Sequence, residues 1–349
     1  MKIIIFSPTS TVFQFEQPQP LGGADSALLK MIEILAEEHE VEAYIPISQD
    51  TAGSFRGANI FPFMDLFDGK RECDILIMYR KVWAIPNTVK YKNLLFYSQD
   101  TVDTPCFSGI KDRECFKIFD RIILLSQFHK ENFKTLFDLP EEKYFVLGNA
   151  TDEMPFVEKK PLSFIYFSTP FRGLVVLMKM WKTIIKKYPT AKLHVFSSMA
   201  IYGAKQLDEM HFKAMLEGLE RMEGVTSYGS RPHEEVMAQL QKSFMLLYPN
   251  VYPETYCNVL MESRAAHTPF ITTDRGALKE TGGLAGMYVS GNPYTEEYQK
   301  DFMEKLDSII KYPEVYVEMQ KQCYPVRTWE DYAKDLLSEI NRLNQEIKI

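Results

Sequence analysis

Short apolar runs alternate with longer amphipathic segments from the first residues of the chain. Residues 3–6 form a β-branched run typical of a buried strand, and residues 24–38 carry apolar side chains at helical spacing. A Gly-containing loop lies between them, and a second apolar run follows at residues 41–45. The first 45 residues therefore predict a strand, a helix and a second strand, which is a βαβ unit.

The same alternation continues along the chain as two series of elements. The first series predicts further strands at residues 74–78, 93–97, 121–125 and 144–147, and a helix at 128–137. The second series predicts strands at residues 163–167, 192–196, 225–228, 244–248 and 269–272, and helices at 174–187, 208–222, 234–242 and 256–266. Repeated βα units with right-handed connections predict two doubly wound parallel sheets, so the expected fold class is α/β.

A chain of 349 residues is too long for one core, which favours two domains. We place the boundary near residues 153–161, with one domain at 1–155 and a second at 156–327. The amphipathic last helix is expected to cross back, so that residues 328–349 pack on the first domain. Ligands bind beyond the carboxyl ends of parallel strands, and a cleft between two such domains is the default site.

Composition excludes several classes of protein. The net charge is −7 and like charges do not cluster, which argues against nucleic acid as a partner. Apolar runs stay well short of the ~20 residues of a membrane span, so we expect membrane contact to be at most peripheral. The five cysteines are dispersed without a CxxC pair, which indicates reduced thiols, no zinc site and a cytoplasmic location.

Two glutamates eight residues apart mark the strongest candidate site. Glu254 lies in a Pro-containing turn after a strand, and Glu262 lies about two turns along a helix that we expect to begin near residues 255–257. Carboxylates suit ligand hydroxyls, and N–H groups at a helix start suit phosphate. The candidate phosphate-binding positions are Thr255, Tyr256, Cys257 and Asn258. The alternative is two ordinary glutamates, one capping a helix and one solvated.

Three other segments are candidates for the same ligand. Gly22 and Gly23 precede a helix and would let the backbone approach phosphate, although a plain tight turn is an alternative. Arg172 stands at a helix start, where a cation is unfavourable unless it meets an anion such as a diphosphate; the alternative is a solvated surface residue. Ser198 and Tyr202 follow a strand end and are candidates to contact a nucleotide base.

The chain resembles a known family in several of these segments. Residues 253–280 resemble the E-x7-E signature of GT-B retaining glycosyltransferases of the family-4 group. Residues 21–24 resemble the glycine loop of that family, and residues 168–174 resemble a variant of its Arg/Lys phosphate motif. The resemblance covers most of the chain and implies the GT-B fold, in which two Rossmann-like domains face each other across a cleft.

The resemblance also implies roles for single residues. Arg172 would hold the donor diphosphate, Glu254 would contact the hydroxyls of the donor sugar, and Glu262 would hydrogen-bond the ribose. The chain departs from the family at two places. One cation of the phosphate motif is missing, and Lys179 is a candidate to compensate.

The second departure lies where the family often has a histidine near the acceptor. This chain has Gln99 there, which can hydrogen-bond a sugar but cannot shuttle a proton. Two alternatives stay open: Asp100 shares that role, or the donor phosphate itself acts as the base.

The expected function is transfer of a sugar from a nucleotide diphosphate donor to an acceptor hydroxyl with retention of configuration. Arg172 and a helix dipole would stabilise the departing phosphate, so we expect neither a metal nor a separate cofactor. The donor base (UDP, GDP or ADP) stays open, as does the acceptor, which is a glycan, a lipid-linked molecule or a small molecule. The alternatives are a nucleotide-sugar epimerase on the same fold, or a non-catalytic nucleotide-sugar or glycan binding module.

Overall fold

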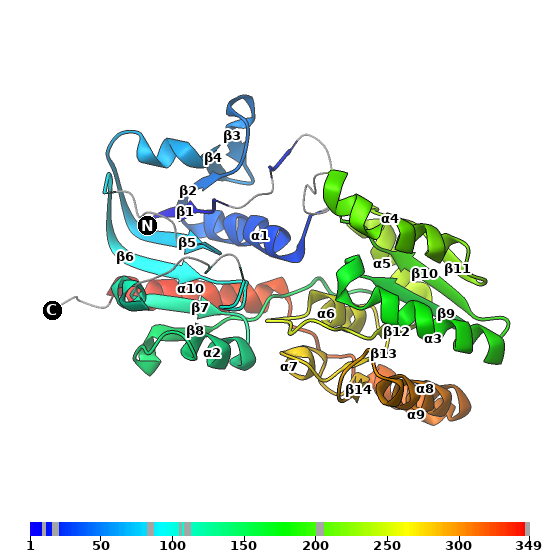
Figure 1. The fold of residues 1–349 in the computed structure, drawn as a ribbon. Coiled ribbons are helices and arrows are strands. Elements are labelled where there is room, and N and C mark those ends of the chain that lie inside the picture. Colours follow the sequence, from blue (N-terminus) through cyan, green and yellow to red (C-terminus); the bar gives the residue numbers. More distant parts are fainter. Residues whose placement is uncertain are drawn as a thin grey trace. The chain divides into compact units, whose positions relative to one another are not determined.

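A computed structural model describes residues 1–8, 12–15, 21–81, 87–104, 107, 113–199 and 206–345 (Figure 1). The chain divides into two compact units. The first unit comprises Met1–Asn149 together with Trp329–Ile349, and the second comprises Ala150–Thr328. Among the helices of the described ranges, none is both long enough and apolar enough to cross a membrane.

The first unit is built on a sheet that has eight strands in the described ranges, in the order β3-β4-β2-β1-β5-β6-β7-β8. The strands are β1 (Lys2–Phe6), β2 (Glu40–Ile45), β3 (Gly53–Phe55), β4 (Ala58–Pro62), β5 (Arg71–Tyr79), β6 (Val89–Tyr97), β7 (Arg121–Leu124) and β8 (Tyr144–Val146). Only the pairing of β3 with β4 is antiparallel among these described strands. β1 and β5 lie side by side at the centre, where the order of connection reverses.

Three α-helices of the described ranges belong to this unit, namely α1 (Gly23–Glu38), α2 (Gln127–Lys134) and α10 (Trp329–Gln345). α10 packs against α1 and β6 and lies along the first unit in Figure 1. It buries the stripe Tyr332, Leu336, Ile340 and Leu343, and the hydroxyl of Tyr332 lies 3.2 Å from that of Tyr97. The prediction that the last helix returns to the first domain is confirmed.

The second unit is a parallel sheet with six strands in the described ranges, in the order β11-β10-β9-β12-β13-β14. The strands are β9 (Lys160–Phe167), β10 (Lys192–Phe196), β11 (Val225–Ser227), β12 (Ser243–Tyr248), β13 (Phe270–Thr273) and β14 (Gly286–Val289). Counted from β9, this is the Rossmann order 3-2-1-4-5-6. The order reverses between β9 and β12, which is where such sheets bind ligands.

Helices cover both faces of this sheet. They are α3 (Leu174–Lys187), α4 (Gln206–Glu220), α5 (His233–Lys242), α6 (Asn258–Ala265), α7 (Leu278–Gly282), α8 (Glu296–Lys311) and α9 (Pro313–Lys321). One continuous apolar core joins them, with Trp181, Phe164 and Leu246 among its fully buried members. The predicted α/β class with two doubly wound, Rossmann-like units is therefore confirmed.

Candidate functional site

The strongest predicted residues lie in two loops at the carboxyl ends of β9 and β12. The first loop runs from β9 through the short 3₁₀ turn η5 (Pro170–Arg172) into α3. The second leaves β12 and carries residues 249–257 to the start of α6. β9 and β12 are neighbours in the sheet, so both loops leave at its reversal point.

Arg172 and Glu254 meet directly across these two loops. The Nη1 atom of Arg172 lies 2.7 Å from Oε1 of Glu254, and the two side chains are only 16% and 14% exposed. The guanidinium also lies over the ring of Tyr252, 3.8 Å from its centroid. The two residues that we expected to serve different parts of a ligand therefore pair with each other.

Besides this ion pair, Glu254 accepts hydrogen bonds from Tyr248 at the end of β12 and from Asn250 in the loop that follows. Tyr248 donates its hydroxyl to Oε1 of Glu254 at 3.0 Å, and Asn250 donates Nδ2 at 3.4 Å. The side chain of Asn250 also accepts from the N–H of Tyr252 and donates to its carbonyl, both at 2.9 Å. Burial raises the pKa of Glu254, and this effect outweighs the opposing influence of Arg172. The carboxylate is thus fixed at several points in an environment that disfavours its charge.

The backbone of Gly276 lies directly against the backbone of Glu254. Its φ is +61°, and a Cβ at this position would lie 2.6 Å from the carbonyl oxygen and 2.7 Å from the nitrogen of Glu254. The next residue, Ala277, donates its N–H to the same carbonyl at 2.8 Å. Gly173 has a similar role before α3, because its φ is +114° and a Cβ there would overlap the carbonyl of Pro249. Glycine is required at both positions by backbone contact as well as by conformation.

Glu262 pairs with a residue for which the sequence analysis predicted no role. Its Oε1 accepts a hydrogen bond from Nε2 of His233 at 3.0 Å. His233 is the first residue of α5, and Glu262 lies in α6. The hydrogen bond from Glu262 raises the pKa of His233. Pro232 before a helix start was the only local signal, and it does not point to Glu262.

The segment between the two glutamates requires a correction. The helix begins at Asn258, with Cys257 as its N-cap residue, and not at residues 255–257. The N–H of Cys257 donates to Oγ1 of Thr281 at 3.2 Å, so that amide is engaged within the protein in this structure. Burial raises the pKa of the Cys257 thiol well above its ordinary value. Thr255 is buried and Tyr256 is half-buried beside it.

The remaining donor-side candidates are Ser198, Lys179 and Tyr202. Ser198 is half-buried just beyond the end of β10. Lys179 lies on the exposed face of α3, and in the described part of the chain it forms no ion pair. Tyr202 lies outside the described residues.

The two glycines predicted to bind donor phosphate and the acceptor-side candidates belong to the first unit. Gly22 is the N-cap residue of α1 with φ −67°, a conformation open to any residue, and Gly23 begins the helix. Gln99 is buried. Asp100 receives two hydrogen bonds from Arg80, at 2.9 and 3.1 Å, so both carboxylate oxygens are engaged.

A buried histidine holds the backbone of Asp100. His129 donates Nε2 to the Asp100 carbonyl at 3.0 Å, while its Nδ1 accepts from the N–H of Leu125 at 3.1 Å. Burial lowers the pKa of His129 to about 4, so the ring is neutral at pH 7. Neither Arg80 nor His129 was predicted to serve this site.

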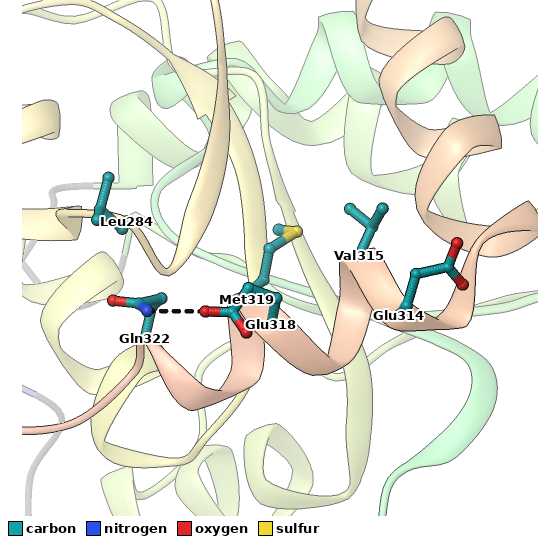
Figure 2. Close-up of a pocket in the computed structure, with 6 residues that line it drawn as sticks. All are labelled: Leu284, Glu314, Val315, Glu318, Met319 and Gln322. Carbon is teal, nitrogen blue, oxygen red and sulfur yellow. Dashed lines mark hydrogen bonds between the residues drawn. The ribbon is translucent and has the colours of Figure 1, made fainter.

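A shallow apolar hollow of the second unit lies apart from these residues. Its volume is about 420 Å³, and it is lined by Leu284, Glu314, Val315, Glu318, Met319 and Gln322, as Figure 2 shows. None of the predicted site residues that the structure describes lines it. Within those described ranges, His, Cys, Asp and Glu side chains also form no group of three or more that could hold a metal ion.

This architecture is that of the GT-B glycosyltransferases, whose solved structures it matches along nearly its whole length. Residues 158–325, which lie in the second unit, match the family model described as glycosyl transferases group 1. Among curated proteins, none matches this chain.

Three solved structures illustrate the likeness. Sucrose-phosphate synthase from Thermosynechococcus elongatus is 13% identical, with a TM-score of 0.74 over 98% of this chain and 99% of that chain. HepE from Anabaena, solved with UDP, is 13% identical, with a TM-score of 0.66 over 98% and 100%. WaaG, a glycosyltransferase involved in lipopolysaccharide biosynthesis, is 13% identical, with a TM-score of 0.66 over 100% of both chains. At these identities the likeness shows the fold alone.

Proposed function

We propose that this protein transfers a sugar from a nucleotide diphosphate donor to an acceptor hydroxyl, with retention of anomeric configuration, as in the family-4 group. The observation that supports this best is the Arg172–Glu254 pair, held 2.7 Å apart at the reversal point of a group 1 glycosyltransferase domain. In this proposal the second unit binds the donor. The first unit receives a glycan, lipid-linked or small-molecule acceptor near Gln99 and Asp100.

The chemistry assigns different tasks to the two paired residues. Negative charge grows on the departing diphosphate, and the guanidinium of Arg172 suits it because its fork of N–H donors matches phosphate oxygens. The N-terminus of α6 adds partial positive charge on the same side. Glu254 accepts hydrogen bonds from hydroxyls of the donor sugar. The leaving phosphate takes the acceptor proton, so the reaction needs no metal and no separate cofactor.

The donor base is proposed from the neighbours. HepE was solved in complex with UDP and also with UDP-glucose, which makes uridine diphosphate sugars the first donors to test. GDP-sugars form the second set. The expected location is the cytoplasm, where both kinds of donor are made, with membrane contact at most peripheral.

The decisive experiment measures release of nucleoside diphosphate from UDP-glucose and GDP-mannose, with and without EDTA, by the wild type, Glu254→Gln and Arg172→Ala. Glu304→Ala on α8 is the control, because among the residues that the structure describes this exposed side chain forms only a surface ion pair with Lys300. We expect activity in EDTA, a loss of roughly 100-fold or more in the two site variants, and no loss in the control. Retention is read from the anomeric signal of the product by NMR. If no nucleotide sugar is turned over or raises the melting temperature of the wild type, the proposal fails.

A further inference from the structure

The contact between His233 and Glu262 joins the first residue of α5 to the middle of α6. α5 follows β11 and α6 follows β12, so both helices begin at the carboxyl ends of parallel strands. α5 and α6 also pack against each other. The Nε2 atom of His233 lies 3.0 Å from Oε1 of Glu262. His233 therefore lies at the same end of the parallel strands as Arg172 and Glu254.

The two partners differ in exposure. The side chain of Glu262 is 19% exposed, whereas the imidazole of His233 is 67% exposed. Within the residues that the structure describes, no hydrogen bond engages Oε2, the second carboxylate oxygen of Glu262. One oxygen is thus fixed by the imidazole, and the other remains available to a donor from a ligand.

The surroundings of His233 are acidic. Glu262, Asp152 and Glu234 are the charged groups that act on the ring, and all three raise its pKa.

We propose that His233 is a positioning residue that orients Glu262 toward the ribose of the bound nucleotide. Through this contact the donor site selects ribonucleoside diphosphates over their 2′-deoxy forms. The inference rests on the proposed function, because it requires a nucleotide in the second unit. A fixed carboxylate oxygen discriminates strongly for a hydroxyl, because a ligand that lacks this hydroxyl leaves a partly buried charged acceptor without a partner.

The test compares dissociation constants for UDP against 2′-deoxy-UDP, and for GDP against 2′-deoxy-GDP, by isothermal titration calorimetry. The proteins are the wild type, His233→Phe and His233→Gln, each checked for an unchanged melting temperature. Phe keeps a flat ring without a donor, whereas Gln places an amide N–H near the position of Nε2. We expect the wild type and His233→Gln to prefer the ribose form by roughly tenfold. The preference should fall to within about twofold in His233→Phe.

The outcomes separate the two proposals. If the wild type binds a nucleoside diphosphate and His233→Phe keeps the full ribose preference, the role of His233 is refuted and the donor site stands. If the wild type binds UDP or GDP without preferring the ribose form, the role of His233 is also refuted. If neither UDP nor GDP binds and no nucleotide sugar is turned over, the proposed function fails, and the inference fails with it.

Discussion

Gly276 offers a sharp test of how Glu254 is positioned. Replacement by alanine would place a methyl group 2.6 Å from the Glu254 carbonyl oxygen and 2.8 Å from the carbonyl carbon of Pro253. These contacts are all with backbone, which cannot rotate away. Ordinary van der Waals contact begins near 3.4 Å, so the Glu254 loop must retreat by about 0.8 Å. The carbonyl of Glu254 also accepts from Ala277, so this movement disturbs a hydrogen bond as well.

The expected effects on stability and activity follow from that movement. A non-glycine residue in the left-handed region costs about 1–2 kcal/mol, and the backbone contact should bring the total for Gly276→Ala to about 3 kcal/mol or more. A displacement of about 1 Å in a catalytic site can lower the rate by about 100-fold. We therefore expect kcat/KM for the nucleotide sugar to fall by roughly 10–100-fold.

Gly291→Ala is the matched control for Gly276→Ala. Gly291 belongs to the same unit and has φ +106°, but a Cβ there would meet nothing within 4 Å. Alanine at position 291 therefore has the backbone strain of a positive φ but no steric clash. Unfolding in urea and steady-state kinetics should show about 1–2 kcal/mol of destabilisation in the control with unchanged kcat/KM. Equal destabilisation of both variants, together with full activity of Gly276→Ala, would refute the reasoning.

Three further predictions concern single side chains. Tyr252→Leu removes the ring under Arg172 and should weaken UDP binding by about fivefold, which is about 1 kcal/mol. Tyr252→Phe keeps the ring and should bind UDP within about twofold of wild type. An equal loss of affinity in both variants would assign the effect to the hydroxyl. Glu254→Gln removes a negative charge beside the diphosphate, so calorimetry should show that UDP binds at least about threefold more tightly. Turnover of the UDP-sugar should nevertheless fall. Weaker binding of UDP by this variant would contradict the prediction. His129 has its pKa lowered to about 4 from an ordinary 6.5, so its contribution to stability is complete above pH 6.5 and is lost as the pH falls toward 4. The free energy of unfolding of wild type should therefore drop by about 3 kcal/mol more than that of His129→Gln across this range, and parallel pH curves for the two proteins would rule the effect out.

The sequence predicted the parallel strands well because they are buried on both faces. Runs such as residues 3–6 and 244–248 are continuously apolar, and a continuous apolar run is the pattern that a buried parallel strand requires. β3, β4 and β14 were missed because they are short and partly exposed, so no such run marks them. α8 carried a usable signal: Tyr298, Phe302, Leu306 and Ile309 recur at helical spacing and are all buried.

The sequence predicted single site residues where a local sequence pattern marks them, but it did not predict the contacts between them. Arg172 and Glu254 each lie in a turn that follows a strand, which is visible in the sequence. Their contact is not visible, because 82 residues separate them and only the pairing of β9 with β12 brings them together. His233 was missed for the same reason, since its partner lies on a different helix. Pairing between distant elements depends on the strand order, and no window of sequence contains it.

The structure changes how the single cation of the phosphate motif is understood. Arg172 is mostly buried, with Glu254 at one nitrogen and the ring of Tyr252 against its face. Both partners are themselves fixed by Asn250, which hydrogen-bonds the backbone of Tyr252 and the carboxylate of Glu254. A guanidinium held in this way loses little side-chain entropy when a diphosphate arrives, whereas a free arginine loses up to about 2 kcal/mol. Fixed orientation can therefore supply part of the affinity that a second, mobile cation would supply elsewhere, and it does so without adding charge to the site.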